Sequence, residues 1–470
     1  MESTRRARIN ASAGAMARLL AAATPILAFL LAAAATLFRQ TGIPKVRTIW
    51  AEDATVFVGC AYAHPSPVAC LFEPYNGWIH LVPRLAAQLA ALVPPADLPI
   101  AIALISAVVT GLAAAVVSIA VRNASGSWAA GVLAGSSVAF VWQAGLEVGG
   151  NLTNLPWILL AAAIVVIVAS WAGHRVGLAD LALIVMAGLS TAFAPVLPAL
   201  GLIGVALRRP RAPLLVVAGG FAAFVQVVVG LTSPRTPPGQ FPIDPGDAVG
   251  LFTDQVIDHG AFGFIRTPPG WAILAGIVVI NAIAVIRIVL ERRADAEAEA
   301  DAIRPRAAEE EPGANGARPA RVTSDPAMAI VVTLGLIGTG LATYTVALVL
   351  QRVFNPRYTY VAAVLLCSAL ALSAALVGRG MTDPPGTIAR WIRLAARLAL
   401  PAAALLLVSG FARSFLLETR ASSGPDVVAE YRAAEPACDR GAASIRLDVS
   451  PYSQFHWTIV IPCDRVRASR

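Results

Sequence analysis

The chain consists of apolar segments separated by short polar stretches, and this alternation is the feature that most limits its fold. A helix needs about 20 apolar residues to cross a bilayer, and windows of about 17 to 25 residues recur along the whole sequence. Of the 470 residues, 57% are hydrophobic and 14% are charged, which is far more apolar than a soluble domain. We predict an all-α polytopic membrane protein with about eleven transmembrane helices.

Basic residues set the predicted orientation. Arg5, Arg6 and Arg8 precede the first apolar segment, so the positive-inside tendency places the N-terminus in the cytoplasm and the C-terminus outside the cell membrane. The segment 16–38 is longer than the apolar core of a secretory signal, which favours a retained first span. The net charge of +8 comes from arginines in short loops, where they act as topology signals. We therefore expect membrane lipids and no nucleic acid as partners.

The polar stretches divide the chain into four parts. A transmembrane module is predicted over 1–290, with outer loops at 39–97 and 232–270, and further transmembrane helices over 327–412. The intervening 291–326 is charged and rich in alanine, proline and glycine, which predicts a disordered cytoplasmic linker. Residues 413–470 form an extracytoplasmic tail. Spans are expected at 16–38, 98–121, 128–146, 155–171, 178–193, 195–207, 213–231, 271–290, 327–350, 361–377 and 398–411, and a helix along the membrane surface at 79–93.

The cysteines agree with this topology, although they were not used to draw it. Cys60 and Cys70 lie in the first outer loop, Cys438 and Cys463 lie in the tail, and Cys367 lies within a span. Disulfides persist in oxidising compartments, and proximity in sequence favours the pairs 60–70 and 438–463. Five unpaired thiols are the alternative. The sequence contains no CxxC motif and no regular Cys/His spacing, so it does not predict a zinc site.

The first outer loop is the strongest candidate for chemistry, because it carries adjacent carboxylates. Neighbouring residues point in different directions on a helix or a strand, so Glu52 and Asp53 cannot both face one atom. One can accept a proton from an attacking hydroxyl, while the other orients a ligand, binds a divalent cation or caps a short helix. A solvated acidic pair at a helix start is the plainer alternative.

Four short motifs carry a resemblance to a known family: WAEDATVF, YNGWIHLVPRL, GNLTNLPW and FNPRYTYV. Together with a carboxylate loop after the first span and many further spans, they resemble the GT-C superfamily of integral membrane glycosyltransferases. The resemblance implies a polyprenyl-phosphate sugar donor, an active site at the outer membrane face and a loop carboxylate as the base. That role carries over to Glu52 or Asp53. Glu precedes Asp here, unlike the commonest acidic pairs of the superfamily, so the identity of the base stays open.

A departing phosphate needs cations near it. Arg84, Arg352 and Arg357 are predicted at the outer face, where arginine can grip phosphate oxygens in bidentate fashion, and His80 lies close to Arg84 in sequence. The alternative is that these side chains are interfacial anchors. Outer arginines run against the positive-inside tendency, which favours the functional interpretation.

Further polar and aromatic residues are candidates for binding substrate or a metal. Amide, carboxylate and aromatic side chains suit sugar hydroxyls and sugar rings. The substrate-binding candidates are Glu147, Asn151, Asn154, Trp157 and Tyr358. No cofactor is fixed by the sequence; Mg²⁺ or Mn²⁺ could be held by Asp53, Asp254 and Asp258, of which the last two share a face if they are helical. A solvated loop helix is the alternative for that pair.

The leading functional hypothesis is a bacterial, inverting membrane glycosyltransferase that moves a sugar from a polyprenyl-phosphate donor to an envelope glycan or lipid outside the cell. A transporter or flippase for lipid-linked sugars is the main rival. Such proteins place ionisable groups near the bilayer midplane, whereas the span centres here are almost uncharged. A noncatalytic envelope-assembly protein is the third possibility.

Overall fold

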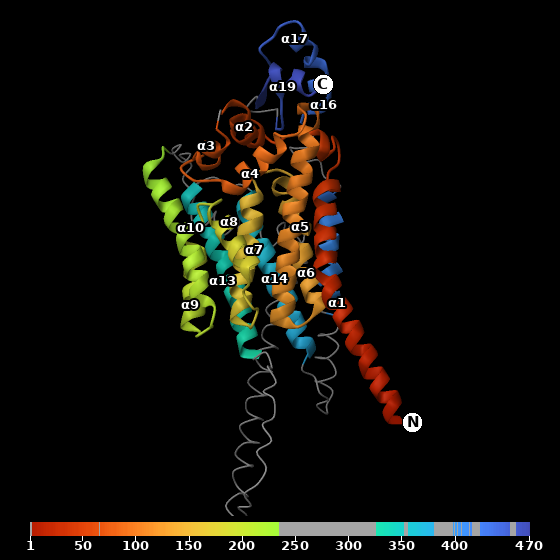
Figure 1. Ribbon diagram of the computed structural model, residues 1–470. Helices are drawn as coiled ribbons and strands as arrows, with labels where there is room; N and C mark the ends of the chain where they lie inside the picture. The colour runs from red at the N-terminus through yellow and green to blue at the C-terminus, as the bar shows by residue number, and fades with distance from the viewer. Residues whose placement is uncertain are drawn as a thin grey trace, which may run out of the picture.

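The computed structural model describes residues 2–64, 66–234, 326–351, 356–379, most of 398–415, 424–451 and 457–470. Helices form a bundle with a smaller cap at one end (Figure 1). The main helices of the bundle are α1 (Glu2–Phe38), α5 (Leu98–Ser125), α6 (Trp128–Phe140), α7 (Leu155–Trp171), α8 (Leu178–Gly188), α9 (Val196–Ala206), α10 (Ala212–Thr232), α13 (Pro326–Gln351) and α14 (Pro356–Arg379).

The bundle is that of an all-α membrane protein. In the described part of the chain, three helices are long and apolar enough to cross a membrane: Pro95–Ser125, Ala212–Thr232 and Arg357–Ala375. Helix α10 also exposes a stripe of large apolar side chains at intervals of three and four residues, and lipid is the solvent that such a face suits. The stripe consists of Leu214, Val217, Phe221, Phe224, Val228 and Leu231. The predicted number of eleven spans is not confirmed, and the span expected at 271–290 lies outside the described residues.

Helix α7 lies at the centre of the bundle. All of its residues except Trp157 are buried, and it contacts α5, α8, α9, α13 and α14. Its sequence is hydrophobic on every side, which is typical of a fully enclosed helix. Small residues bring the neighbouring α5 and α6 into close contact: a Cβ on Gly131 or Gly135 would lie 2.7 or 2.6 Å from a backbone oxygen of α5.

The third predicted span, 128–146, is too long. Helix α6 ends at Phe140, and a separate π-helix, η4 (Ala144–Val148), follows it. Arg39, at the end of α1, explains the break, because its Nη1 donates to the carbonyls of Ala139 and Val141 at 2.5 and 2.9 Å. The carbonyls at this helix end thus bond to a distant side chain.

The cap is built from two parts of the chain that are far apart in sequence. We use "the cap" for the described residues of 45–97 and 424–470. The first part contains η1 (Lys45–Arg47), η2 (Asp53–Val58), α2 (Gly59–Ala63), α3 (Pro67–Phe72), α4 (Leu81–Ala90) and η3 (Pro95–Asp97). The second contains α16 (Val427–Ala434), α17 (Pro436–Asp439), β1 (Ser444–Asp448), β2 (Thr458–Pro462) and α19 (Cys463–Ala468). Helix α4 falls within the helix expected at 79–93, and its place along a membrane surface stays a prediction.

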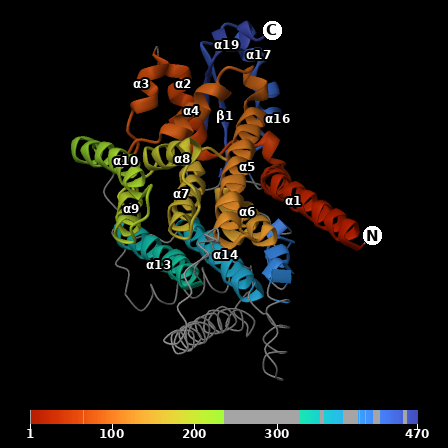
Figure 2. The same cartoon turned by 60° about the horizontal axis from the view of Figure 1, so that its bottom comes forward.

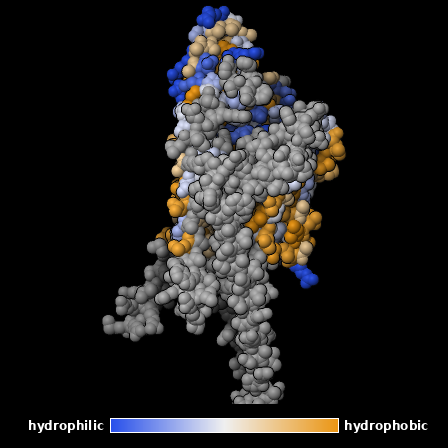
Figure 3. Space-filling model, turned by 180° about the vertical axis from the view of Figure 1, so that it is seen from behind, coloured by the Kyte–Doolittle hydropathy of each residue, from blue (hydrophilic) through white to orange (hydrophobic). Residues whose placement is uncertain are grey.

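The two parts of the cap pack on each other at one end of the bundle (Figure 2). The Ser450 amide donates to the carbonyl of Ile49 (3.0 Å), and the Arg465 guanidinium donates to the carbonyl of Ala91 (3.2 Å) and covers the Tyr62 ring. Strands β1 and β2 pair antiparallel, with Ser444 opposite Pro462. Seen from behind, hydrophilic residues gather over the cap and hydrophobic residues over the sides of the bundle (Figure 3).

Both favoured cysteine pairs form disulfides in the structure. Cys60 bonds to Cys70 within the first loop, and Cys438 bonds to Cys463 within the tail. Cys367 is a buried free thiol in α14. Each disulfide thus closes a short segment of the cap.

Candidate functional site

Asp53 is fully buried and is directed away from solvent. Its carboxylate accepts hydrogen bonds from the Leu152 amide (2.9 Å), the Thr153 amide (2.8 Å) and the Thr153 hydroxyl (2.6 Å). Burial raises the pKa of this carboxyl to about 7, and the three hydrogen bonds oppose that rise. Asp53 therefore fastens the first loop to the turn that precedes α7.

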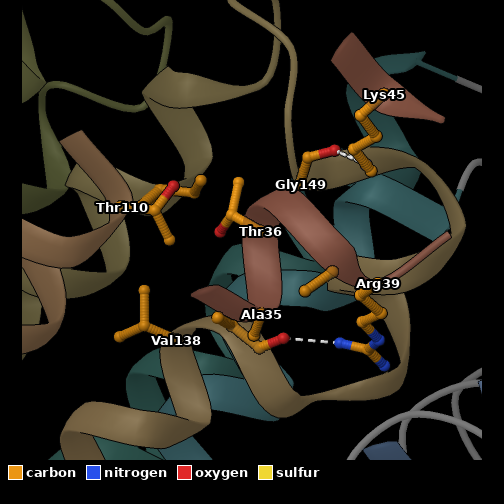
Figure 4. Close-up of a pocket in the computed structure, with 10 residues that line it drawn as sticks. Ala35, Thr36, Arg39, Lys45, Thr110, Val138 and Gly149 are labelled. Carbon is orange, nitrogen blue, oxygen red and sulfur yellow. Dashed lines mark hydrogen bonds between the residues drawn. The ribbon is translucent and has the colours of Figure 1, made fainter. Parts of the chain in front are cut away.

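The same turn, residues 147–154, is held by three further side chains. Asn151 and Asn154 donate their amide N–H groups to the carbonyl of Glu147, at 2.6 and 3.1 Å. Lys45, buried in the loop after α1, donates to the carbonyl of Gly149, as Figure 4 shows. Burial and the neighbouring Arg39 lower the pKa of Lys45 to about 7. Together with Asp53, these contacts fix the backbone position of Glu147.

Glu52 faces a different group from its neighbour. Its Oε1 lies 3.8 Å from Nη1 of Arg357, and Oε1 of Glu147 lies 3.7 Å from the same nitrogen. The three side chains come from the first loop, the 147–154 turn and the start of α14. Each keeps some contact with solvent: the two glutamates are 14% exposed and Arg357 is 23% exposed, whereas Asp53 is 0% exposed. These three residues are called the carboxylate–arginine cluster below.

Aromatic rings line one side of this cluster. The Arg357 guanidinium lies 5.6 Å from the centre of the Tyr358 ring, and that ring meets Trp157 edge to face at 5.6 Å. Trp157 in turn packs against Phe193, which follows α8. The predicted substrate residues Trp157 and Tyr358 thus lie beside the cluster; their contact with a sugar stays a prediction, as it does for Asn151 and Asn154.

His80 is packed among aromatic rings at the start of α4. Its ring lies 5.9 Å from Phe57 and 5.6 Å from Tyr75, and its Nδ1–H donates to the carbonyl of Trp78 at 3.2 Å. Burial, with the nearby charges of Arg84 and Arg357, lowers its pKa to about 4. The lowered pKa favours the neutral ring at physiological pH, and the role of His80 at the donor phosphate stays a prediction.

Arg84 is buried beside the first disulfide. Its side chain is 1% exposed, lies 3.9 Å from the Glu73 carboxylate and covers the Phe57 ring at 5.6 Å. Its Nη1 lies 3.6 Å from the sulfur of Cys70. Burial lowers the pKa of Arg84, and Glu73 opposes that effect. These contacts tie α4 to the segment that the disulfide closes; its predicted role in phosphate binding stays a prediction.

A cleft of about 730 Å³ opens between the first loop and the C-terminal hairpin. Tyr75, Glu73 and Thr55 line it from the first loop, and Thr458 and Val460 line it from β2. Burial and the charge of Glu52 raise the pKa of Tyr75 to about 12, and the charge of Arg357 opposes that rise. The cleft and the carboxylate–arginine cluster are therefore neighbours across Tyr75.

The predicted metal site stays a prediction, because two of its three residues lie outside the described part of the chain. Among the described residues, the one group of three close potential ligands is Cys60, Cys70 and Glu73, and the disulfide already uses both sulfurs. Asp53 accepts three hydrogen bonds within the protein. Asp254 and Asp258 lie outside the described residues, as does Arg352, the third predicted phosphate ligand.

Two residues that position this site, Lys45 and Gln226, are not among the residues predicted from the sequence. Lys45 was visible as the single lysine in an arginine-rich chain, and its burial gives that oddity a structural meaning. Gln226, in the middle of α10, is fully buried and makes hydrogen bonds to both backbone groups of Ile79 and to the carbonyl of Gly188. A glutamine within an apolar span was a signal that it has buried partners.

Comparisons with known proteins find little. No protein-family model matches the chain, and no curated protein matches it. Among solved structures, the chain is similar to the archaeal oligosaccharyltransferase AglB from Archaeoglobus fulgidus, in complex with an inhibitory peptide and a dolichol-phosphate. The identity is 13% and the TM-score is 0.38; the match covers 90% of this chain and 58% of that one.

Proposed function

We propose that the protein is a membrane glycosyltransferase that uses a polyprenyl-phosphate sugar donor. The observation that carries this proposal is the carboxylate–arginine cluster, which joins a partly exposed carboxylate base to an arginine at the cap end of the helices. A general base must reach the proton it removes, and an arginine can hold a phosphate by paired hydrogen bonds. Both requirements meet within this one cluster.

Glu52 is the better base of the two adjacent carboxylates. Asp53 is completely buried and spends its oxygens on the 147–154 turn, whereas Glu52 retains exposure and faces Arg357. Glu147 lies 3.7 Å from the same guanidinium nitrogen and helps to position it.

In the proposed reaction, Glu52 takes the proton of an acceptor hydroxyl, and the hydroxyl oxygen attacks the anomeric carbon. The bond between that carbon and the phosphate oxygen breaks, and the polyprenyl phosphate leaves with the electron pair. Attack opposite the leaving group inverts the anomeric centre. Arg357 stabilises the departing phosphate, and the acceptor, an envelope glycan or lipid, approaches through the cleft beside Tyr75.

The experiment uses the full chain in nanodiscs, a panel of radiolabelled polyprenyl-phosphate sugars and membrane glycan acceptors. Wild type is compared with Glu52→Gln and with Glu430→Gln, which removes an exposed carboxylate on α16. Loss of a general base is expected to slow transfer by about 100-fold or more. Glu430→Gln should transfer like wild type. Equal transfer by all three proteins would refute the assigned base.

The same preparation distinguishes the rival function. A flippase would move a labelled lipid-linked sugar across a vesicle without transferring the sugar. Translocation without transfer by wild type, over the whole panel, would replace the transferase proposal with transport.

A further inference from the structure

A second pocket lies at the end of the bundle away from the cap. It has a volume of about 280 Å³ and is lined by the segments that follow α7 and α9, including His174, Arg175, Arg209 and Arg211. This is close to the lower end of the volumes of small-molecule sites, about 300 Å³. Nothing in the proposed transfer reaction uses these residues.

The two segments enter the pocket by the same backbone device. After α7, Gly173 has a φ of +101°, and the amide of His174 returns to the carbonyl of Ala169. After α9, Arg208 has a φ of +55°, and the amide of Arg209 returns to the carbonyl of Gly204. Both are Schellman helix ends, in which one residue takes a left-handed conformation. Glycine suits that conformation, whereas an arginine adopts it at a cost, so the turn that delivers Arg209 is held by its surroundings.

The charges of the pocket are strongly one-sided. Arg175, Arg209 and Arg211 line it, whereas the nearby carboxylate of Asp180 is directed to His174 (3.2 Å) and to the Gly177 amide (2.8 Å). Arg211 is fixed by donating to the carbonyl of Val176. The Nε of Arg209 is buried and has no hydrogen-bond partner among the described residues. A buried N–H on a cation without a partner is costly, and an anionic oxygen would satisfy it.

The position of the pocket along the length of the bundle indicates the source of its ligand. Helix α7 has 17 residues and therefore spans about 25 Å, with the Asp53-bound turn before its first residue and the pocket after its last. That length is close to the hydrocarbon thickness of a bilayer, about 30 Å. If the cluster lies at one membrane surface, the pocket lies at the opposite one, at the level of lipid headgroups.

We infer that the pocket binds the phosphate group of an anionic molecule, and that a membrane lipid headgroup supplies it. Basic pockets between transmembrane helices bind phosphate-bearing headgroups by charge and hydrogen bonds. The plain alternative is that these arginines only set the membrane topology. In that case each arginine should contribute equally to lipid binding, whether or not it lines the pocket.

The test measures lipid retention by native mass spectrometry of the full chain in detergent, titrated with phosphatidylglycerol or phosphatidylcholine. Arg175→Gln and Arg209→Gln each remove a cation that lines the pocket; Arg175 is exposed, so its replacement does not threaten folding. Arg208→Gln is the matched control, because Arg208 is an exposed arginine in the same turn that does not line the pocket.

Wild type should retain phosphatidylglycerol at least tenfold more tightly than phosphatidylcholine. Each pocket variant should lose most of that preference, and Arg208→Gln should keep it. Equal retention of the two lipids by wild type, or an equal loss in all three variants, would overturn the inference. A further arm adds inorganic phosphate without lipid: a rise in the unfolding temperature that depends on Arg175 and Arg209 would keep the phosphate site and assign it to a soluble ligand.

Discussion

The contrast between Asp53 and Glu52 gives the sharpest prediction. Asp53→Asn replaces a carboxylate that accepts three hydrogen bonds by an amide with a single acceptor oxygen. The amide NH₂ must then face the Leu152 amide or the Thr153 pair, so at least one buried donor loses its acceptor. An unsatisfied buried donor costs about 1 to 3 kcal/mol. Loss of the buried charge acts in the opposite direction, because a carboxyl whose pKa is raised from 3.8 to about 7 makes the folded state less stable as the pH rises between these values. We expect Asp53→Asn to remove this pH dependence and to be less stable than wild type at the low end of the range, by about 2 kcal/mol.

Chemical denaturation between pH 4 and pH 8 measures both effects, because the wild-type carboxyl, with a pKa of about 7, is neutral at the low end and mostly ionised at the high end. Thr153→Val is the matched variant. It removes only the hydroxyl bond and leaves both backbone amides paired, so it should cost about 1 kcal/mol. The protein that remains folded in Asp53→Asn should still transfer sugar. An Asp53→Asn protein as stable as wild type but without transfer would refute the positioning role and make Asp53 the base.

Three further outcomes follow. His80 has a pKa of about 4 in the folded state and 6.5 in the unfolded state, so the unfolded state binds more protons between these pH values. The free energy of unfolding should therefore fall as the pH drops from 6.5 toward 4, by at most about 3 kcal/mol. In denaturation measured at several pH values, His80→Phe should remove this fall. Arg357→Lys keeps the charge but loses the planar fork, so it should weaken donor binding about tenfold, as a lipid-phosphate titration would show, and unchanged binding would contradict the role of Arg357. The double variant Cys438→Ala, Cys463→Ala removes a disulfide that joins residues 25 positions apart, and the cap should lose about 3 kcal/mol of stability. Limited proteolysis should then cut the tail faster than in wild type. Equal rates of proteolysis would show that packing alone holds the tail.

Much of the bundle was predictable because the signals are local. The helix expected at 155–171 has the bounds of α7, and the one expected at 98–121 begins with α5 and ends four residues short of it. Apolar length, proline at the helix start and the polar residues that follow set these ends. Sequence proximity likewise favoured both cysteine pairs that the structure joins.

The site itself was only half predictable, because distant contacts decide it. The sequence indicated that Glu52 and Asp53 divide two tasks, but only the position of the Thr153 amide shows which of them turns inward. The premature end of α6 depends on Arg39, which lies about a hundred residues earlier. Neither contact leaves a periodic pattern in the chain.

The most direct test of the central claim is a single-turnover measurement on Glu52→Gln. Donor is first bound to saturation in nanodiscs, acceptor is added, and both the transferred sugar and the released polyprenyl phosphate are followed. If Glu52 is the base, the variant should bind donor as wild type does and transfer it about 100-fold more slowly, with sugar and phosphate appearing together. Transfer at the wild-type rate from the same bound donor would contradict the account.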